Sequence, residues 1–401
     1  MMKIIIIAQF NSFSFEGGNS RFTYLLDLFD YKNNDVEFIT SNFHHATKTK
    51  RKIDKKTLDK CNYKLTFIDE PGYKKNISIK RMVSHKILSK RIKKYLKNLN
   101  YKPDVIYCAI PSLDVAYEAV TFTKKNGIRF IVDIQDLWPE AFKMALNIPV
   151  ISNVIFYPMK RKANYIYSNA DDIVAVSETY VNRALSVNSK KTEGLSIFLG
   201  TDLGYFDKCQ KENKVVHKDN VIRVAYIGTL GTSYDIKSVI DAIKILKNKG
   251  IKNVKFIIMG NGPLEESFEM YAKQSDIDYQ FTGRLDYEKM VGLLSSCDIC
   301  VNPIVGLSVA SIINKVGDYA AAGLPVINTQ NSEEYKELID RYKAGYNCNN
   351  GDSIDIANKL ETLIKDEKLR IKLGSGNRRL AEEKFDRNKT YPKIIKLIER
   401  G

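Results

Sequence analysis

Long hydrophobic runs are absent from this sequence of 401 residues. The longest early apolar run, Ile4–Ala8, is far shorter than the roughly 20 residues that a membrane-spanning helix needs, and no small-residue cleavage site follows it. We therefore interpret this run as a first buried strand and expect a cytoplasmic chain. Cysteine is also scarce, with six residues spread over the whole length, so we do not expect a disulfide framework.

Clusters of metal-ligating residues are missing as well. The four histidines lack metal-ligand spacing. Cys297 and Cys300 have the spacing of a zinc or redox pair, but they have no second pair and straddle the start of an apolar strand, which favours a structural role. Asp276 and Asp278 form an Asp-x-Asp pattern in a turn before a strand. We expect neither a metal nor a cofactor.

Acidic residues are scarce in the first half of the chain. Lys and Arg number 63 against 47 Asp and Glu, and residues 1–200 alone hold 32 basic and 19 acidic side chains. Residues 48–102 hold 19 basic and 4 acidic residues. An anionic partner, either a nucleic acid or an anionic membrane surface, would explain this excess. The alternative is a lysine-rich composition that covers every solvated surface in this way.

What the sequence does contain is an alternation of strand-length apolar runs with helix-length segments, which is typical of a parallel sheet wrapped by helices. After a polar stretch, Lys208–Asn220, the alternation restarts. We therefore predict an α/β chain with two domains. The expected strands are Lys3–Ala8, Val36–Thr40, Lys64–Ile68, Val105–Ala109, Ile128–Ile134 and Ile173–Val176, then Ile222–Ile227, Val254–Met259, Tyr279–Phe281, Ile299–Val301 and Val326–Asn328.

The break between the two series sets the expected boundaries. We predict a first domain over residues 1–202, a linker over 203–220, a second domain over 221–384, and a C-terminal helix over 385–401 that packs back towards the first domain. Ligands of open parallel sheets bind beyond the carboxyl ends of the strands, so we look for site residues there.

One segment, Ile313–Ile327, combines a loop, a helix of small residues, a Gly-Leu-Pro turn and a buried strand. Alanines in such a helix allow close approach of a ligand. Asp318 can accept two hydrogen bonds from a vicinal diol such as that of a ribose. Lys315 lies about one helical turn earlier, where it can meet a phosphate beside the positive end of the helix. An ordinary capped helix with an acidic first turn is the alternative.

This segment resembles the Lys-x-x-Glu/Asp-Tyr-x-Ala-x-Gly-x-Pro-Val pattern of the family 4 glycosyltransferases, which have the GT-B fold. The resemblance implies two Rossmann-like domains that face a central cleft, with a nucleotide-sugar in the second domain and the acceptor in the first. Other family-like pieces occur in the same order: Gly17-Gly18, Val174–Ser177, Gly200–Asp202, Tyr226–Thr229, Met259–Pro263 and Phe281–Arg284. The implied donor-binding residues are Gly17, Gly18, Gly228, Thr229, Lys237, Gly260, Gly283, Arg284, Asn314, Lys315, Asp318 and Tyr319.

A narrower resemblance lies in Asp133–Glu140, which contains the single tryptophan of the chain. It is similar to the Asp-Leu-Trp-Pro-Glu segment of bacterial capsule and O-antigen N-acetyl-L-fucosaminyltransferases. The resemblance implies a UDP-sugar donor, with UDP-N-acetyl-L-fucosamine as the expected one, and an undecaprenyl-diphosphate-linked saccharide as acceptor. It places Trp138 and Glu140 on the acceptor side, although a Trp before a Pro can also be a packed corner.

The sequence departs from the family pattern at two positions near the expected diphosphate and donor sugar. A Glu that contacts the donor sugar in many members is replaced by Ala310, and an Arg after the Tyr-x-Gly strand is replaced by Thr229. We therefore expect the negative charge of the diphosphate to be balanced by Lys237, Lys315, the Gly231 loop and helix N-termini.

Reaction with inversion at the sugar carbon would need a general base. A β-L-linked donor that gives an α-L product requires such inversion. Asp136 is the first candidate for the base, and Glu16, beside Gly17-Gly18, is the second.

Residues 76–100 have the pattern of a basic amphipathic helix, with apolar residues near helical spacing and Lys90, Arg91, Lys93 and Lys94 between them. We expect peripheral attachment to the inner face of the cell membrane, although the apolar stripe can equally pack on the sheet of the first domain. Two other functions stay open. A nucleotide-sugar epimerase would need an acid and base pair and no lipid acceptor. A nucleic-acid-binding protein would need aromatics among the basic residues, which residues 48–102 offer poorly, so we expect no nucleic acid partner.

Overall fold

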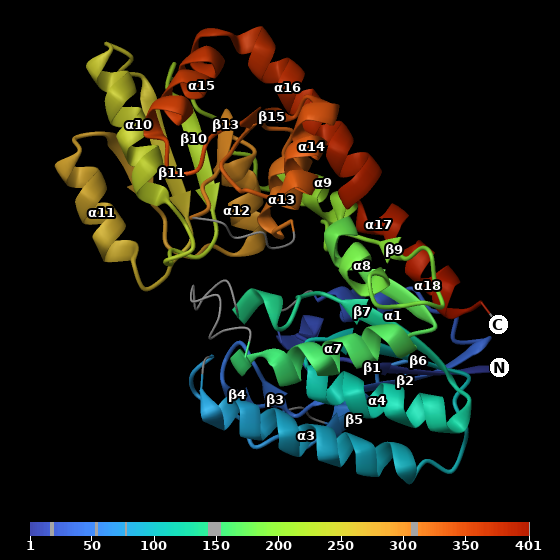
Figure 1. Cartoon of the computed structure of the whole chain (residues 1–401). Coiled ribbons are helices and arrows are strands. Elements are labelled where there is room, and N and C mark those ends of the chain that lie inside the picture. The colour runs from blue at the N-terminus through green and yellow to red at the C-terminus, as the bar shows by residue number, and fades with distance from the viewer. Residues whose placement is uncertain (17–19, 53–54, 77, 143–153, 306–311, 401) are drawn as a thin grey trace. The chain divides into compact units, whose positions relative to one another are not determined.

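The chain divides into two α/β units in the computed structural model (Figure 1). Unit 1 comprises Met1–Ile197 and Tyr391–Gly401, and unit 2 comprises Phe198–Thr390. The structure describes residues 1–16, 20–52, 55–76, 78–142, 154–305 and 312–400. Each unit is presented by itself below.

Unit 1 is built on a parallel sheet with the strand order β5-β2-β1-β6-β7-β8-β9. Every pair in it is parallel, and the interior strand β1 sets Ile4 opposite both Val36 of β2 and Val105 of β6. The strands are β1 (Met2–Ile7), β2 (Asn34–Ser41), β5 (Lys64–Ile68), β6 (Val105–Ile110), β7 (Arg129–Ile134), β8 (Asp172–Ala175) and β9 (Leu195–Ser196). A short antiparallel pair, β3 (Phe43–His44) and β4 (Thr49–Lys50), follows β2.

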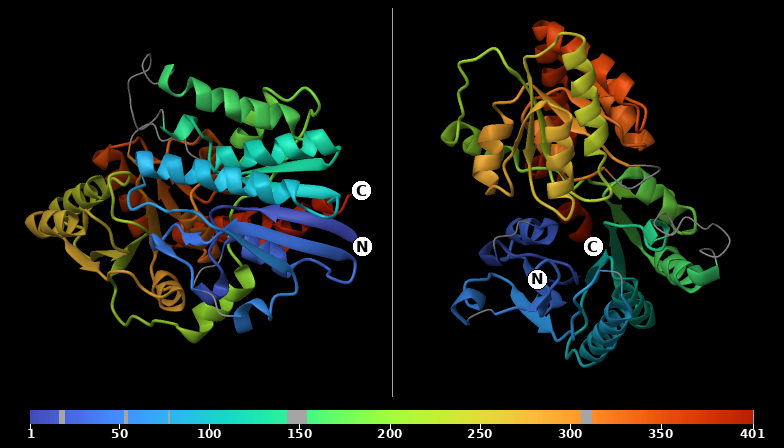
Figure 2. Two further views of the ribbon diagram at one scale, coloured as in Figure 1. Left: turned by 90° about the horizontal axis from the view of Figure 1, so that it is seen from below. Right: turned by 90° about the vertical axis from the view of Figure 1, so that its left-hand side faces the viewer.

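Helices cover both faces of this sheet. Alternate residues of β1 pack on α1 (Arg21–Asp27) and on the C-terminal helix α18 (Pro392–Ile398), which form one buried cluster. On the other face α3 (Ile79–Lys97), α4 (Leu113–Asn126) and α7 (Tyr157–Asn169) lie side by side, as the blue, teal and green helices of Figure 2. The remaining elements are η1 (Ser14–Glu16), α2 (Lys55–Leu58) and α8 (Glu178–Leu185).

Unit 2 repeats the same architecture with the strand order β12-β11-β10-β13-β14-β15, again with parallel pairs. This order places the first strand of the unit at the centre, as expected for a doubly wound sheet. The strands are β10 (Ile222–Ile227), β11 (Val254–Met259), β12 (Asp278–Phe281), β13 (Ile299–Asn302), β14 (Val326–Asn328) and β15 (Gly345–Asn347).

One face of the second sheet carries α10 (Ile236–Asn248), α11 (Glu265–Gln274) and α15 (Ser353–Lys365). The other face carries α9 (Leu203–Glu212), α12 (Tyr287–Leu294), α13 (Lys315–Ala321) and α14 (Glu333–Tyr342). Then α16 (Glu367–Leu380), a π-helical turn (Ala381–Phe385) and α17 (Arg387–Thr390) complete the unit. The predicted α/β fold with two Rossmann-like domains is thus confirmed.

The structure differs from the sequence analysis around residue 203. The expected linker over residues 203–220 contains α9, which belongs to unit 2. Asp202 caps this helix by accepting a hydrogen bond from the backbone N–H of Tyr205, and Leu203, Phe206 and Cys209 bury its inner face. The polar stretch Lys208–Asn220 overlaps the second half of this short helix, so the apolar spacing is too brief to reveal the helix in the sequence.

Candidate functional site

Three glycines line the carboxyl edge of the unit 2 sheet. Gly228, Gly260 and Gly283 follow β10, β11 and β12, and they are tied together by backbone hydrogen bonds: Gly228 N donates to Met259 O at 2.9 Å, and Gly260 N donates to Gly283 O at 2.9 Å. Gly260 has a φ of +147°, and a Cβ there would lie 1.9 Å from the carbonyl oxygen of Gly228. No side chain fits at this position, so bare backbone forms the edge.

The ammonium group of Lys315 lies directly at this edge. Its Nζ is 4.0 Å from the ring centroid of Tyr226 and 3.9 Å from that of Tyr234, and it would be 3.3 Å from a Cβ placed on Gly228. The side chain is buried, and Nζ has no hydrogen-bond partner among the described residues. Burial alone lowers the pKa of Lys315 well below its ordinary value. A buried cation without an acceptor is costly, and an anion at the glycine edge would satisfy it.

Three more residues that the sequence predicts for the site, Asp318, Tyr319 and Asn314, lie on or next to α13. Asp318 accepts hydrogen bonds at Oδ1 from Thr201 Oγ1 at 3.0 Å and from Tyr287 OH at 2.9 Å, and burial raises its pKa. Tyr319 is fully buried, and its hydroxyl accepts from the backbone N–H of Ile227 at the end of β10. Tyr319 therefore supports the strand that carries the glycine edge. Asn314 is exposed at the start of the helix.

Lys237, Thr229 and Arg284 are further residues that the sequence predicts for the donor site. Lys237, on α10, places its Nζ 5.0 Å from the ring centroid of Tyr271 on α11. Thr229 uses its backbone carbonyl to accept from Tyr226 OH at 2.8 Å, and Arg284 is exposed after Gly283. Gly17, Gly18 and Ala310 lie outside the described residues.

In unit 1, Asp136 and Trp138 follow the carboxyl end of β7. Trp138 Nε1 donates to Asp136 Oδ2 at 2.9 Å, and the indole ring stacks on His85 of α3 with centroids 6.1 Å apart. Burial raises the pKa of Asp136, while the indole hydrogen bond and the nearby charge of Arg81 oppose that rise. A carboxylate with a raised pKa beside a strand end is suited to proton transfer.

Glu16 and Glu140, which the sequence also predicts for the site, each form an ion pair with an arginine of unit 1. Glu16 forms an ion pair with Arg51 and accepts from the backbone N–H of Phe13 at 3.1 Å. Glu140 accepts from Arg183 Nε of α8 at 2.6 Å. These contacts tie Glu16 and Glu140 to the scaffold of unit 1, whereas Asp136 is hydrogen-bonded to a neutral donor.

The basic helix of residues 76–100 is α3, and its apolar stripe packs on unit 1 through Leu88, Ile92 and Leu96. Lys90, Arg91, Lys93 and Lys94 are exposed. Arg91 forms an ion pair with Asp69, and Lys93 pairs with Glu118 at 2.8 Å. Large apolar side chains are exposed instead at the start of the helix: Ile79 (80%), Met82 (56%) and Val83 (49%).

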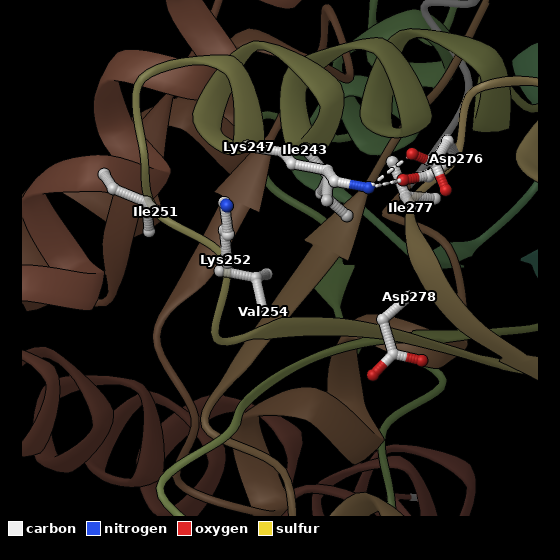
Figure 3. Close-up of a pocket in the computed structure, with 8 residues that line it drawn as sticks. All are labelled: Ile243, Lys247, Ile251, Lys252, Val254, Asp276, Ile277 and Asp278. Atoms are coloured by element: carbon white, nitrogen blue, oxygen red, sulfur yellow. Dashed lines mark hydrogen bonds and ion pairs between the residues drawn. The ribbon is translucent and has the colours of Figure 1, made fainter.

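The Asp-x-Asp pattern lies beside a hollow of about 260 Å³ on unit 2, and Figure 3 displays the side chains around it. Asp276 points to Lys247 and pairs with it at 2.7 Å, whereas Asp278 lies at the start of β12 with Lys255 3.8 Å away. Both carboxylates are at the amino edge of the sheet, opposite the glycine edge. Among the described residues no group of three or more His, Cys, Asp or Glu could hold a metal ion.

The sequence analysis missed the aromatic partners of the site. Tyr226 and Tyr234 flank Lys315, but a tyrosine in a strand and another in a turn carry no signal of a shared cation. Arg81 and His85 contact Trp138, yet in the sequence they lie among many basic residues. Within the described ranges no helix is long and apolar enough to cross a membrane.

Comparison with known proteins places these features in context. Residues 222–366 match the family model of the glycosyl transferases group 1. The chain is 25% identical over 302 residues to the capsular polysaccharide biosynthesis glycosyltransferase CapM of Staphylococcus aureus, a match that covers 71% of this chain and 73% of CapM. It is 22% identical over 336 residues to the Bacillus subtilis (strain 168) protein EpsD, a glycosyltransferase by name, with 79% and 82% covered. The crystal structure of Anabaena Alr3699/HepE in complex with UDP has a TM-score of 0.68 at 14% identity and covers 99% of each chain.

Proposed function

We propose that the protein moves a sugar from a UDP-sugar to an undecaprenyl-diphosphate-linked saccharide in capsule or surface polysaccharide synthesis. The premise of this proposal is the GT-B fold of the chain and the match of residues 222–366 to the family model of the glycosyl transferases group 1. UDP-N-acetyl-L-fucosamine is the first donor to test. The relative CapM supports a role in capsular polysaccharide synthesis, and the UDP complex of HepE supports a uridine nucleotide.

The observation that carries the proposal is the unpartnered ammonium group of Lys315 at the glycine edge. A diphosphate needs a cation and backbone N–H groups that it can approach closely, and this edge offers both. Asp318, on the same helix, is the candidate acceptor for the ribose hydroxyls, and the contacts from Thr201 and Tyr287 hold its carboxylate in place.

The proposed reaction is a displacement at the anomeric carbon of the donor sugar. An acceptor hydroxyl attacks that carbon, its proton passes to Asp136, and the bond between the sugar and the diphosphate breaks. UDP leaves with both bonding electrons, and Lys315 balances the charge that develops on it. With Asp136 as base the configuration at the sugar carbon inverts.

Peripheral membrane attachment belongs to the same proposal, because a polyprenyl-linked acceptor resides in the bilayer. The exposed basic residues of α3 and the exposed Ile79, Met82 and Val83 support it. A basic helix end with apolar side chains is suited to an anionic interface.

A UDP-release assay with a lipid-linked acceptor tests the donor site. Asp318→Ala should lower kcat/KM by about a hundredfold, because it removes charge-assisted hydrogen bonds to the ribose. Lys343→Ala, an exposed lysine in the same unit, serves as the matched control. An unchanged rate in folded Asp318→Ala would remove Asp318 from the site.

A stereochemical assay tests the base. Asp136→Asn should lower kcat while UDP affinity stays within about twofold, because the carboxylate serves the acceptor. Proton NMR of the product should show inversion relative to the donor. Retention would exclude the direct displacement and leave Asp136 as an orienting residue.

A further inference from the structure

A second cluster of cations and aromatic rings lies in unit 1, beyond the carboxyl ends of four strands of the sheet. Its members come from separate segments that follow β1, β2, β5 and β7, and from the first half of α3. They are Phe10, His45, Lys48, Tyr73, Arg81, His85 and Trp138. We call these seven residues the aromatic–cation cluster.

Arg81 is the centre of the cluster. Its guanidinium carbon lies 5.6 Å from the ring centroid of Phe10, 5.5 Å from that of Tyr73 and 5.0 Å from that of Trp138. One of its nitrogens, Nη1, donates to the carbonyl of Asn76 at 2.7 Å. Its Nε lies 3.5 Å from Nε2 of His85. Three aromatic rings thus surround the guanidinium and limit the positions it can take.

Lys48 brings a second positive charge to the cluster. Its Nζ lies 5.2 Å from the ring centroid of Tyr73 and 3.1 Å from Nδ1 of His45, a ring nitrogen that is also 2.6 Å from Tyr73 OH. In the described part of the chain neither Lys48 nor Arg81 forms an ion pair with a carboxylate.

Burial keeps the two histidines of the cluster neutral, and the nearby positive charges add to its effect. Burial and the charges of Lys48 and Arg81 lower the pKa of His45 to about 4, and burial and Arg81 lower that of His85 to about 3. A bound anion would offset the effect of the positive charges, and a neutral imidazole also offers an N–H donor.

The carboxylates that face the cluster do not neutralise it. Glu70 is 1% exposed, and its oxygens accept from Gln9 Nε2, Ser41 Oγ and Ser84 Oγ. Asp136 accepts from the indole N–H of Trp138. Both acids are thus satisfied by neutral donors, while the two cations lack acidic partners.

We propose that the aromatic–cation cluster binds the diphosphate group of a lipid-linked acceptor, with Arg81 as the principal contact. This inference rests on the proposed function and adds the chemical group by which the acceptor is recognised. Arginine in a fixed plane suits the bidentate recognition of a phosphate, and the surrounding rings suit the first apolar atoms of the attached chain. Because Asp136 is hydrogen-bonded to Trp138 of this cluster, the acceptor hydroxyl that reacts would lie only a short saccharide away from the diphosphate.

The single tryptophan of the chain makes the test direct, because Trp138 is the only source of indole fluorescence. Titration of the full chain with geranyl diphosphate should change this fluorescence to saturation. Arg81→Ala should weaken the binding at least tenfold, and Arg81→Lys should weaken it less. Lys86→Ala, exposed on the same helix, is the matched control, and Lys315→Ala separates this cluster from the glycine edge of unit 2.

Geraniol and inorganic pyrophosphate are the other probes. Geranyl diphosphate should bind more tightly than either. Equal binding of geraniol, or equal affinity in Arg81→Ala and wild type, would overturn the anion site. Equal binding of pyrophosphate would overturn the lipid-linked source of the phosphate.

A transfer assay separates this inference from the proposed function. With a geranyl-diphosphate-linked sugar Arg81→Ala should raise KM, and with an uncharged alkyl glycoside it should not. Equal effects on both acceptors would overturn the inference while the transferase stands. Fluorescence binding without transfer to either acceptor would overturn the function while the anion site stands.

Discussion

Lys315 is the residue at which binding and stability oppose each other. Its ammonium group is buried between two tyrosine rings with no acceptor among the described residues. An unsatisfied buried donor costs about 1 to 3 kcal/mol, and a cation–π contact offsets only part of that. The folded chain without ligand therefore carries a strain that a bound anion relieves.

The first prediction follows from that opposition. Lys315→Met keeps the length of the side chain and removes its charge, so kcat/KM should fall by about a hundredfold while the free energy of unfolding at pH 7 rises by about 1 kcal/mol. Urea unfolding of both proteins measures the second effect. A less stable Lys315→Met protein would mean that the ammonium group is satisfied in the folded state.

The second prediction concerns pH. Burial holds the pKa of Lys315 below its ordinary value of 10.5, so the unfolded chain binds more protons than the folded chain between the folded-state pKa and 10.5. The contribution of Lys315 to the free energy of unfolding therefore rises with pH through this window. The stability advantage of Lys315→Met should shrink from pH 7 to pH 9 in urea titrations. An advantage independent of pH would contradict the lowered pKa.

The third prediction concerns Tyr226 and Tyr234 as positioning residues. Tyr234→Leu removes one ring beside Lys315 and should weaken UDP binding about tenfold, whereas Tyr234→Phe keeps the ring and should restore it. Tyr226→Phe keeps the ring but loses the hydrogen bond to the Thr229 carbonyl, so a smaller effect is expected. Calorimetric titration with UDP measures each affinity. Equal losses in Tyr234→Leu and Tyr234→Phe would mean that the hydroxyl of Tyr234, and not its ring, supports the binding of UDP.

At this scale the sequence predicts residues that share one helix better than residues that meet through the fold. Lys315 and Asp318 are three positions apart, so their spacing alone places them on one helical face. The contact of Lys315 with Tyr226 and Tyr234 depends on how α13 packs beside β10. A local sequence pattern therefore does not predict this contact. For the same reason Arg81 and Trp138, 57 positions apart in the sequence, could not be paired.

At the scale of elements, hydrophobic periodicity predicts the strands closely. The runs Ile222–Ile227, Val254–Met259 and Val326–Asn328 coincide with β10, β11 and β14. Two of the four strands at the sheet edges, β9 and β15, were not predicted, because Leu195–Ser196 is very short and Gly345–Asn347 has a single apolar residue. The other two edge strands, β5 and β12, have more apolar residues and were predicted as Lys64–Ile68 and Tyr279–Phe281.

Helix α3 illustrates an ambiguity that sequence cannot resolve. Its apolar stripe was compatible with membrane contact or with packing on the sheet, and the structure buries Leu88, Ile92 and Leu96. The exposed apolar residues lie at the start of the helix instead. Any membrane contact by α3 therefore belongs to this end and to the basic side chains that remain exposed.

The fourth prediction tests this end of α3. Vesicles with phosphatidylglycerol should sediment with the protein, because each lysine near an anionic surface contributes about 1 kcal/mol. The combined change Ile79→Ser and Met82→Ser should lower the bound fraction, as should Lys90→Glu with Lys94→Glu. Ile371→Ser, also exposed (62%) but in unit 2, is the matched control. Equal binding to neutral vesicles, or no loss in either variant, would exclude α3 as the anchor.

At the scale of the whole molecule, the alternation of strands and helices was sufficient to predict two α/β units. The second unit has a Rossmann-like strand order, and its glycine edge follows directly from where β10, β11 and β12 end. The basic excess of residues 1–200 belongs to unit 1, where the aromatic–cation cluster and α3 lie. The proposal that unit 2 binds the donor and unit 1 binds the anionic acceptor agrees with this distribution of charge.

The central claim is the transfer of a sugar from UDP to a lipid-diphosphate-linked saccharide. The most direct measurement is the mass of that acceptor after incubation with a panel of UDP-sugars and the wild-type protein. The account predicts one added sugar residue, with release of one UDP for each, and loss of the product in Lys315→Ala. An acceptor of unchanged mass beside an epimerised UDP-sugar would contradict it.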